Sequence, residues 1–263
     1  MTIDDAVKPA RRGARSLLWP ALATLAGFAV LMGLGFWQIE RMGAKQRLIH
    51  RVEQSVRGAP QVLPPESAWA TLRPKSYEYR KVRVEGRFLH DKEIHVHGLL
   101  SPERPGGQVL QGVYVLTPLQ LDDGAVIYVN RGFVPTEKTD QAARREGLPE
   151  GRVAVTGLLR APEPRGWFLP DDDPAKNSWF VRDPLKMARL AGLTRAAPFV
   201  LDADATPNQG GWPLGGQTRL TFPNDHLQYA ITWFALAAGL LVVFAFFARQ
   251  QTARGHEDGG ASA

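Results

Sequence analysis

The sequence has no cysteine among its 263 residues. A chain without thiols can form no disulfide framework, thiol redox centre or thiolate metal site, which excludes cysteine-based copper or iron–sulfur carriers. The sequence also lacks a Gly-x-Ser-x-Gly motif, a Walker loop and a dinucleotide-binding fingerprint. With no nucleophile or acid–base constellation evident, we predict that the protein is not an enzyme.

Charged residues are absent from two long stretches near the ends of the chain. Residues 17–37 and 227–248 contain no charged side chain. Each stretch is longer than the roughly 18–20 residues that cross about 30 Å of hydrocarbon as a helix. Trp and Tyr side chains lie near their ends, where aromatic rings favour the headgroup region. We therefore predict transmembrane helices at residues 17–37 and 226–248.

The basic residues before the first stretch would also suit a secretory signal peptide. Secretory cores span roughly 7–15 residues and end at a small-residue cleavage site. This stretch is longer and leads into Phe36-Trp37-Gln38. A mitochondrial presequence is disfavoured because Asp4 and Asp5 are acidic. We interpret the stretch as an uncleaved anchor.

The tails outside the two anchors, residues 1–16 and 249–263, are short and carry Lys or Arg. Short basic tails stay in the cytoplasm, whereas a long central segment is translocated largely regardless of its charge. We therefore expect both termini in the cytoplasm and the central domain outside it. The segment between the anchors has a charge balance of only +4, so we expect the lipid bilayer, and no nucleic acid, as a partner.

The central segment begins as a helix and then turns to strand patterns. Residues 38–58 keep an apolar helical stripe and are predicted to form a stalk that ends at Gly58-Ala59-Pro60. In residues 59–222, alternating apolar and polar residues between Gly and Pro turns predict short strands. The predicted strands are residues 81–88, 93–97, 109–121, 125–130, 152–160, 179–182, 197–201 and 218–222.

The fold class that these patterns favour is an α+β membrane protein. Two transmembrane helices would flank an antiparallel β-rich domain, either a sheet or a small barrel. One short helix is expected at about residues 184–191, with Asp183 as its N-cap and Gly192 as its stop. The Gly- and Pro-rich residues 207–216 are predicted to form a flexible linker that returns the chain to the membrane.

Two polar clusters in the central segment invite a metal interpretation. His95 and His97 would project from one face of a strand, and such a pair can ligate zinc or copper. Because only Glu93 offers a third ligand there, exposed polar residues are the simpler interpretation. The residues 171–173, all aspartate, lack the ligand spacing of a calcium loop and suit a solvated loop better.

The segment Asn130-Arg131-Gly132-Phe133-Val134-Pro135 follows a strongly apolar strand. Two roles fit a charged residue there. Arg131 can donate hydrogen bonds to loop carbonyls, which is the simpler role. Alternatively, Asn130 and Arg131 lie on a rim that binds a partner protein.

The outer ends of the two anchors carry the strongest candidate site. His226 immediately precedes the second apolar stretch and shares a helix face with Tyr229 and Trp233. A neutral imidazole there is well placed to ligate a metal or haem iron. From the first anchor, Trp37 and Arg41 reach the same membrane surface, and Arg41 suits an anionic carboxylate. Ordinary interfacial anchoring by these side chains is the alternative.

Five segments together resemble the Surfeit locus protein 1 family, the assembly factors of cytochrome c oxidase. The matching segments are LGFWQIER at residues 34–41, YRKVRVEGRF at 79–88, VNRGFVP at 129–135, NSWFVRD at 177–183 and HLQYAITWF at 226–234. They occur in the family's order, and the resemblance covers residues 17–247. A His pair is not expected at positions 95 and 97 in this family, which further weakens a metal role there.

The resemblance implies a factor that assembles a haem-copper oxidase. It also implies that haem a binds transiently and is inserted into subunit I, with His226 as the iron ligand and no other metal. Trp37, Arg41, Tyr229 and Trp233 would form the haem environment. Subunit I is the expected partner, with haem A synthase as a second candidate. Because no transit peptide is evident, a bacterial inner membrane with a periplasmic central domain is expected.

Two other functions fit the same topology. A scaffold could stabilise subunit I without touching haem. A two-helix periplasmic sensor is more remote, because the tails are too short for a cytoplasmic output domain. Haem bound to the purified protein would separate the haem carrier from the scaffold.

Overall fold

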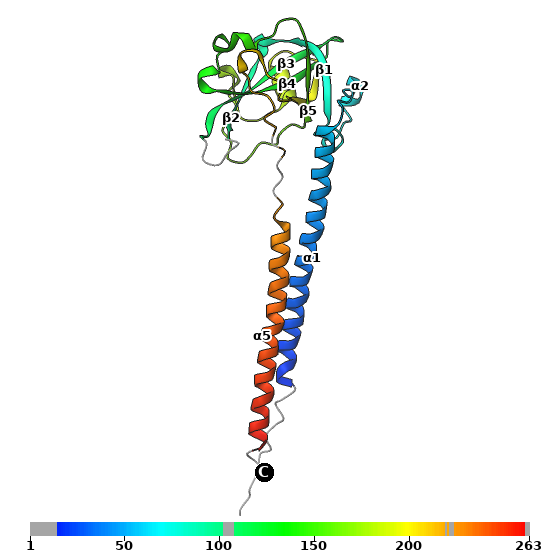
Figure 1. Ribbon diagram of the computed structural model, residues 1–263, viewed down its shortest axis with the longest axis vertical. Coiled ribbons are helices and arrows are strands. Elements are labelled where there is room, and N and C mark those ends of the chain that lie inside the picture. The colour runs from blue at the N-terminus through cyan, green and yellow to red at the C-terminus, as the bar shows by residue number, and fades with distance from the viewer. Residues whose placement is uncertain (1–14, 102–107, 219, 221–223, 261–263) are drawn as a thin grey trace, which may run out of the picture. The chain divides into compact units, whose positions relative to one another are not determined.

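The computed structural model describes residues 15–101, 108–218, 220 and 224–260. The chain forms two compact units. One comprises residues 1–50 with 222–263, and the other comprises residues 51–221. The first is built from helices and the second mainly from strands (Figure 1).

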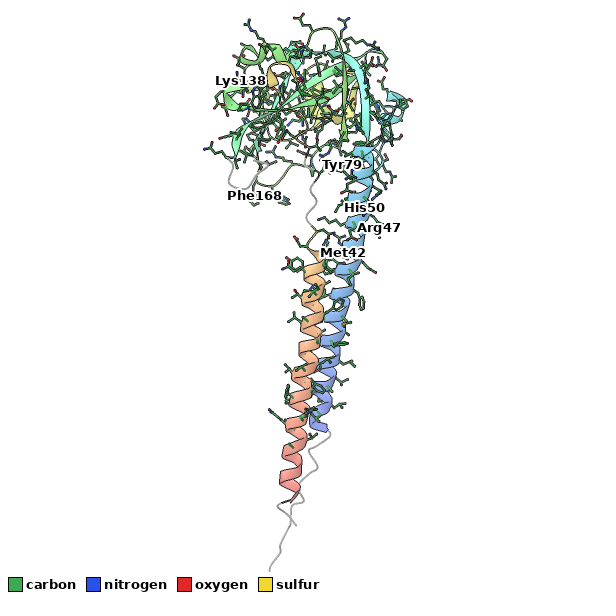
Figure 2. All side chains as sticks on the ribbon, in the orientation of Figure 1. Met42, Arg47, His50, Tyr79, Lys138 and Phe168 are labelled. Carbon is green, nitrogen blue, oxygen red and sulfur yellow. The ribbon has the colours of Figure 1, made fainter. Side chains whose placement is uncertain are left out.

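The helical unit contains the two apolar stretches. Helix α1 spans Arg15–Arg57 and helix α5 spans His226–Gly260. Both contain spans that are long and apolar enough to cross a membrane, and most side chains of these spans project outward (Figure 2). A helix satisfies all its backbone hydrogen bonds internally, which a lipid environment requires. Helix α1 ends at Arg57, one residue before the glycine predicted to stop it; its division into membrane and stalk segments stays a prediction.

The two helices lie side by side through small residues (Figure 1). A Cβ atom added at Gly35 would lie 2.4 Å from the Phe234 ring, so the glycine lets this ring approach the α1 backbone. The Phe36 and Phe234 rings pack edge to face at 5.5 Å. On α5 the buried small residues are Ala230 and Ala237.

Small-xxx-small spacing in the sequence marks only part of this contact. Ala23/Gly27 in the first anchor and Ala235/Gly239 in the second have this spacing, which can let two helices approach closely. Gly27 does lie against Leu240, but a Cβ at Gly239 would meet no atom within 4 Å. Ala23 and Ala235 are exposed. The spacing is too common in apolar helices to identify the contacting face.

The other unit is a β-barrel with two additional strands. The described residues of this unit form seven strands: β1 (Lys81–Phe88), β2 (Ile94–Leu100), β3 (Leu110–Leu121), β4 (Val126–Pro135), β5 (Arg152–Arg160), β6 (Ser178–Trp179) and β7 (Ala196–Ala203). They form one sheet in the order β1-β5-β7-β4-β3-β2-β6. An additional β1–β3 pairing closes five of them into a barrel, while β2 and β6 extend the sheet beyond β3. Of the two predicted alternatives, a sheet or a small barrel, the structure shows the barrel.

Barrel closure depends on a glycine. At the β1–β3 junction Gly86 pairs with Leu121, and Phe88 pairs with Leu119. A Cβ atom at Gly86 would lie 2.2 Å from the carbonyl oxygen of Gln120, so only glycine lets the strands approach this closely. β2 pairs with residues 110–116 of β3, and β1 pairs with residues 119–121. The junction that closes the barrel therefore lies at the C-terminal end of β3.

The prediction that the sheet is antiparallel was wrong for two pairs. β7 runs parallel to β4, and β6 runs parallel to β2. Parallel neighbours need a long crossover connection. The chain supplies it between β4 and β7 with β5, β6 and helix α4 (Pro184–Leu190). Strand patterns in a sequence identify strands but not their order in the sheet.

The apolar core fills the barrel and continues beneath α4. One cluster packs Val82, Val129, Phe199 and Leu201 inside the barrel against Trp69. Trp69 ends the short helix α2 (Glu66–Trp69), which is followed by α3 (Pro74–Tyr77). A second cluster places Met187 and other α4 residues against the sheet. As predicted, Asp183 caps α4, and its side chain accepts a hydrogen bond from the Lys186 backbone N–H at 3.0 Å.

The segment after β7 is not the flexible linker that its Gly and Pro content predicted. Leu214 pairs with Phe133 of β4 through two backbone hydrogen bonds of 2.8 and 3.0 Å. The Asn208 side chain donates to the carbonyl oxygen of Pro213. Residues 207–216 therefore form a fixed covering on β4. The strand predicted at residues 218–222 lies mostly outside the described residues, and Thr218 and Leu220 belong to no strand.

Candidate functional site

The predicted membrane-surface site is built where α1 and α5 meet. His226 is the first residue of α5 and is half-buried. Its Nδ1 lies 2.8 Å from Oε1 of Gln38 on α1. The two residues are 188 positions apart in the sequence, and the packing of the two helices brings them together. The imidazole is thus fixed in position by a specific partner.

Gln38 determines which imidazole nitrogen remains available. With its Oε1 as acceptor, Nδ1 of His226 donates the hydrogen bond and Nε2 carries the free lone pair. Among the described residues, Nε2 of His226 has no hydrogen-bond partner. A histidine ligand commonly binds a metal through one nitrogen while the other donates to an oriented acceptor. The geometry suits a ligand to iron.

The other predicted site residues are only partly gathered around His226. On α1, the Arg41 guanidinium lies 5.9 Å from the Trp37 ring centroid, a cation–π contact that places the two side chains together. Trp37 and Tyr229 are about half exposed, at 50% and 57%. Trp233 is half-buried, one helical turn beyond Tyr229. Among the described residues, the hydrogen bond of the His226 imidazole goes to Gln38 and not to one of these aromatic side chains.

Gln38 is the residue whose role the sequence did not reveal. It lies next to Trp37 in the first anchor, so its presence at the outer end of α1 was evident. Its partner was not, because the alignment of two helices from opposite ends of the chain depends on their packing. The buried Ala230 lies one turn after His226 and faces the same way. In the sequence, that small residue indicates which face of α5 packs on α1, and therefore that the imidazole points toward α1.

In the strand-built unit of residues 51–221, called the β-domain from here on, His95 belongs to a buried charge network and not to a metal site. Its Nε2 lies 2.8 Å from the Glu93 carboxylate, which also accepts two hydrogen bonds from Arg144. The side chains of Glu93 and Arg144 are 3% and 1% exposed. Burial alone would raise the pKa of Glu93, but the hydrogen bonds from His95 and Arg144 lower it overall. The prediction of exposed polar residues was wrong for His95.

His97 and the acidic cluster also have structural partners. His97 Nε2 lies 2.8 Å from the Ser178 hydroxyl, and its ring stacks on Phe180. Asp172 is not solvated as predicted, because it pairs with Lys186 at 2.6 Å and its side chain is 3% exposed. Within the described ranges, no group of three or more His, Cys, Asp or Glu side chains could hold a metal ion.

Asn130 and Arg131 lie inside the domain and not on an exposed rim. Asn130 is 6% exposed and donates to Asp202 at 2.9 Å. Arg131 is 2% exposed and donates to the carbonyl oxygen of Gly147 and, at 3.1 Å, to Asn208 Oδ1. The hydrogen bond to a loop carbonyl is the simpler of the two predicted roles. Partner binding by either residue would require the covering segment to move.

Comparison with known proteins places this architecture in a family. A family model described as the SURF1 family matches residues 25–238, which include all seven strands and His226. The chain belongs to the SURF1 family. The SURF1 match begins within α1 and ends within α5, so it includes both helices that form the Gln38–His226 contact.

Individual SURF1 relatives match most of the chain. Surfeit locus protein 1 of Homo sapiens is 40% identical over 216 residues, 78% of this chain and 70% of the human protein. The Xenopus tropicalis protein of the same name is 37% identical over 244 residues, covering 89% and 77% of the two chains. A SURF1-like protein of Monosiga brevicollis is 37% identical over 261 residues, covering 95% and 94%.

Proposed function

We propose that this SURF1-family protein assembles a haem-copper oxidase by holding haem a transiently and delivering it to subunit I. The observation that supports the proposal is the Gln38–His226 contact, which leaves Nε2 of a positioned imidazole without a partner in the described structure. SURF1 proteins are cytochrome c oxidase assembly factors, and the family match supports the oxidase as the target. No covalent chemistry is required of this chain.

The donor set fits a haem. A single histidine is sufficient to hold haem iron axially. Trp37, Tyr229 and Trp233 offer aromatic surface at the same end of the helix pair, and the first two are half exposed. Arg41 is the cation available for a propionate carboxylate. The haem supplies the redox centre of the oxidase, and this chain orients and protects it before transfer.

The proposed setting follows from the helices. The two candidate spans support a membrane setting, and we propose a bacterial inner membrane with cytoplasmic termini and a periplasmic β-domain. That placement puts Gln38 and His226 at the outer leaflet, where subunit I and haem A synthase would be reached through the bilayer. The β-domain would dock on the extramembrane part of subunit I.

The His226→Ala variant tests the iron ligand. Purified from cells that make haem a, it should carry at least about tenfold less haem than the wild type, because loss of a ligand exceeds the 10–100-fold effect of outer-shell changes. The visible spectrum and the haem-to-protein ratio measure this. His97→Ala is the matched control, since within the described structure His97 bonds to Ser178 and stacks on Phe180, far along the sequence from His226. Equal haem content in wild type and His226→Ala would exclude the assignment, and haem-free wild type would favour a pure scaffold.

The Gln38→Leu variant tests the orienting role of the amide. It removes the hydrogen bond to Nδ1 while keeping an apolar side chain of similar size on α1. We expect roughly tenfold weaker haem retention, together with a changed Soret position because the imidazole is free to rotate. Titrating haem into the purified apoprotein measures both. A Gln38→Glu variant should retain haem better than Gln38→Leu, since a carboxylate also accepts from Nδ1.

A further inference from the structure

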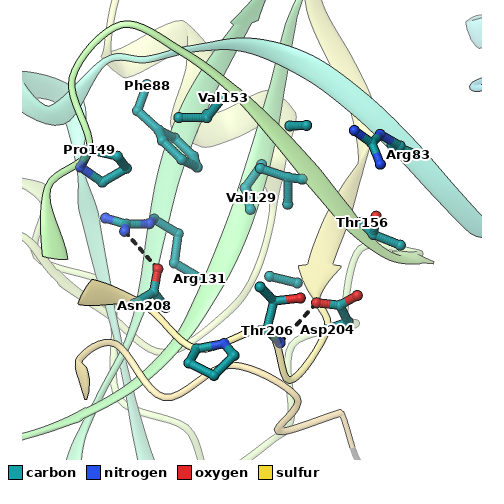
Figure 3. Close-up of a pocket in the computed structure, with 14 residues that line it drawn as sticks. Arg83, Phe88, Val129, Arg131, Pro149, Val153, Thr156, Asp204, Thr206 and Asn208 are labelled. Carbon is teal, nitrogen blue, oxygen red and sulfur yellow. Dashed lines mark hydrogen bonds between the residues drawn. The ribbon is translucent and has the colours of Figure 1, made fainter. Parts of the chain in front are cut away.

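The barrel contains a cavity that the haem proposal does not use. It has a volume of about 350 Å³ and lies between β1, β4, β5 and the segment after β7 (Figure 3). Small-molecule sites are typically clefts of roughly 300–1,000 Å³ with apolar walls and a few converging polar groups. Here Phe88, Val129 and Val153 form apolar walls, and Arg131 and Asn208 lie together at one end (Figure 3).

Arg131 is a buried cation without a counter-ion. The other buried charged residues are Glu93, Arg144 and Asp202, and each forms an ion pair. Arg131 forms none with any described residue, and its Nη1 is buried without a hydrogen-bond partner. Buried charges in proteins are normally paired, because desolvation of an isolated charge is costly. Burial lowers the pKa of Arg131 to about 10, an effect that the attraction of Glu93 only partly offsets.

The surrounding charges do not supply the missing anion. Glu93 acts on Arg131 only at longer range and is already bonded to Arg144. Asp204 also lines the cavity, but it lies at the opposite end from the Arg131 guanidinium and accepts from the Thr206 backbone (Figure 3). Arg83 lines the cavity at the other end from Arg131 (Figure 3), is 60% exposed and pairs with Glu85 at 3.8 Å. Arg131 is therefore the cation at its own end of the cavity, where none of the lining residues is acidic.

The walls next to Arg131 favour an organic anion over an inorganic one. The Phe88 ring lies 4.8 Å from the Arg131 guanidinium carbon and covers one of its faces. Val129 is fully buried and Val153 half-buried beside it. A free phosphate would lose hydration against these surfaces without compensation. At about 30 Å³ for each water-sized group, the cavity holds roughly ten non-hydrogen atoms.

We propose that this cavity binds a small monocarboxylate, with its carboxylate paired to Arg131 and its apolar body against Phe88, Val129 and Val153. The site goes beyond the proposed haem function, because none of its residues belongs to the Gln38–His226 contact. A guanidinium can bind a carboxylate through charge-assisted hydrogen bonds. In Arg131, Nη1 is buried and Nη2 already donates to two acceptors, which leaves the N–H of Nε for the carboxylate. The ligand's carboxylate would neutralise Arg131, which among the described residues is the buried charged side chain that forms no ion pair.

The experiment titrates hexanoate into the full chain in lipid nanodiscs by calorimetry, with empty nanodiscs as the blank. Hexanoate should bind saturably, hexanol at least tenfold more weakly, and acetate more weakly than hexanoate. Inorganic phosphate should not compete. No saturable hexanoate binding, or hexanol binding as tightly as hexanoate, would overturn the proposal. Phosphate competing at equal concentration would overturn it as well.

Variants then locate the site. Thr206→Trp fills the cavity from an exposed loop position, and Gln209→Trp is the matched control outside the lining. Hexanoate affinity should fall at least tenfold in Thr206→Trp and stay within twofold in Gln209→Trp. Arg131→Gln should also lose tenfold or more, provided that its circular dichroism spectrum matches the wild type. Unchanged affinity in Thr206→Trp would place the ligand elsewhere and contradict the proposal even if Arg131→Gln does not fold.

Discussion

Replacing Glu93 by Gln is expected to destabilise the β-domain by about 3–5 kcal/mol, because it leaves the buried Arg144 guanidinium without its carboxylate. Arg144 is 1% exposed at its side chain and also donates to the backbone of Lys138 and Thr139. The network therefore fixes the loop after β4 to the start of β2. Thermal unfolding followed by near-ultraviolet circular dichroism should show a midpoint lowered by roughly 10 °C.

Two companion variants make this prediction specific. Glu85→Gln removes a partner of Arg152 from an exposed ion pair, and it should change stability by less than about 1 kcal/mol. Glu93→Gln combined with Arg144→Met should be less destabilised than the sum of the single changes, because no charge is then left unpaired. Additive effects, or a loss in Glu93→Gln no larger than in Glu85→Gln, would show that the pair does not support the fold.

The same carboxylate has a defined pH signature. The folded-state pKa of Glu93 is lowered below its ordinary value. Its contribution to stability is therefore complete above the unfolded-state pKa of about 4.3. It disappears as the pH falls through the lower folded-state value. Wild type should lose stability more steeply than Glu93→Gln below about pH 4, and parallel curves would contradict this assignment.

Replacing Gly132 by Ala is expected to cost roughly 3–5 kcal/mol, from backbone strain and two lost hydrogen bonds. Gly132 has φ +122°, and a Cβ atom there would lie 2.0 Å from the carbonyl oxygen of Leu214. The methyl group would push residues 212–216 away from β4 and break the Phe133–Leu214 hydrogen bonds. Chemical denaturation measures the loss of stability.

Gly151 provides the control for this prediction. It also has a positive φ, +79°, but a Cβ atom there meets nothing within 4 Å. Gly151→Ala should therefore cost only the conformational penalty of about 1–2 kcal/mol. If both variants lose the same stability, the close approach of Leu214 is not what requires glycine at position 132.

Local patterns in the sequence predicted the strands that have one exposed face. The predicted ranges 81–88 and 152–160 coincide with β1 and β5. The side chains of β1 alternate between core and solvent, and those of β5 alternate between exposed and half-buried positions over residues 152–155. The pattern failed for β4, which was predicted to end at Asn130 but continues to Pro135. Nearly every residue of β4 is buried, because the strand lies between β3 and β7 and its side chains enter both core clusters, while Leu214 pairs with Phe133 near its end. The strand therefore shows no alternation.

Contacts between distant segments could not be predicted. The start of α5 at His226 agrees with the predicted range, because the change from polar to apolar residues marks it. The partner of His226 was not predictable, since it depends on how α1 and α5 align. Glu93 and Arg144 are likewise 51 residues apart, and each alone resembles an ordinary surface charge. Sequence patterns identify elements, whereas buried polar pairs arise from their packing.

The central position of β7 has a consequence for synthesis of the chain. β7 lies between β5 and β4 in the sheet, although it is the last strand to be made. From Pro135 to Ala196 the ribosome must add roughly 60 residues, which takes about 3–12 s at 5–20 residues per second. Throughout that interval the edge of β4 that β7 will occupy has no partner, and the facing edge of β5 has none once Arg160 has been added, so both can pair with other chains. The nascent domain is therefore a substrate for holding chaperones until shortly before the second membrane helix emerges.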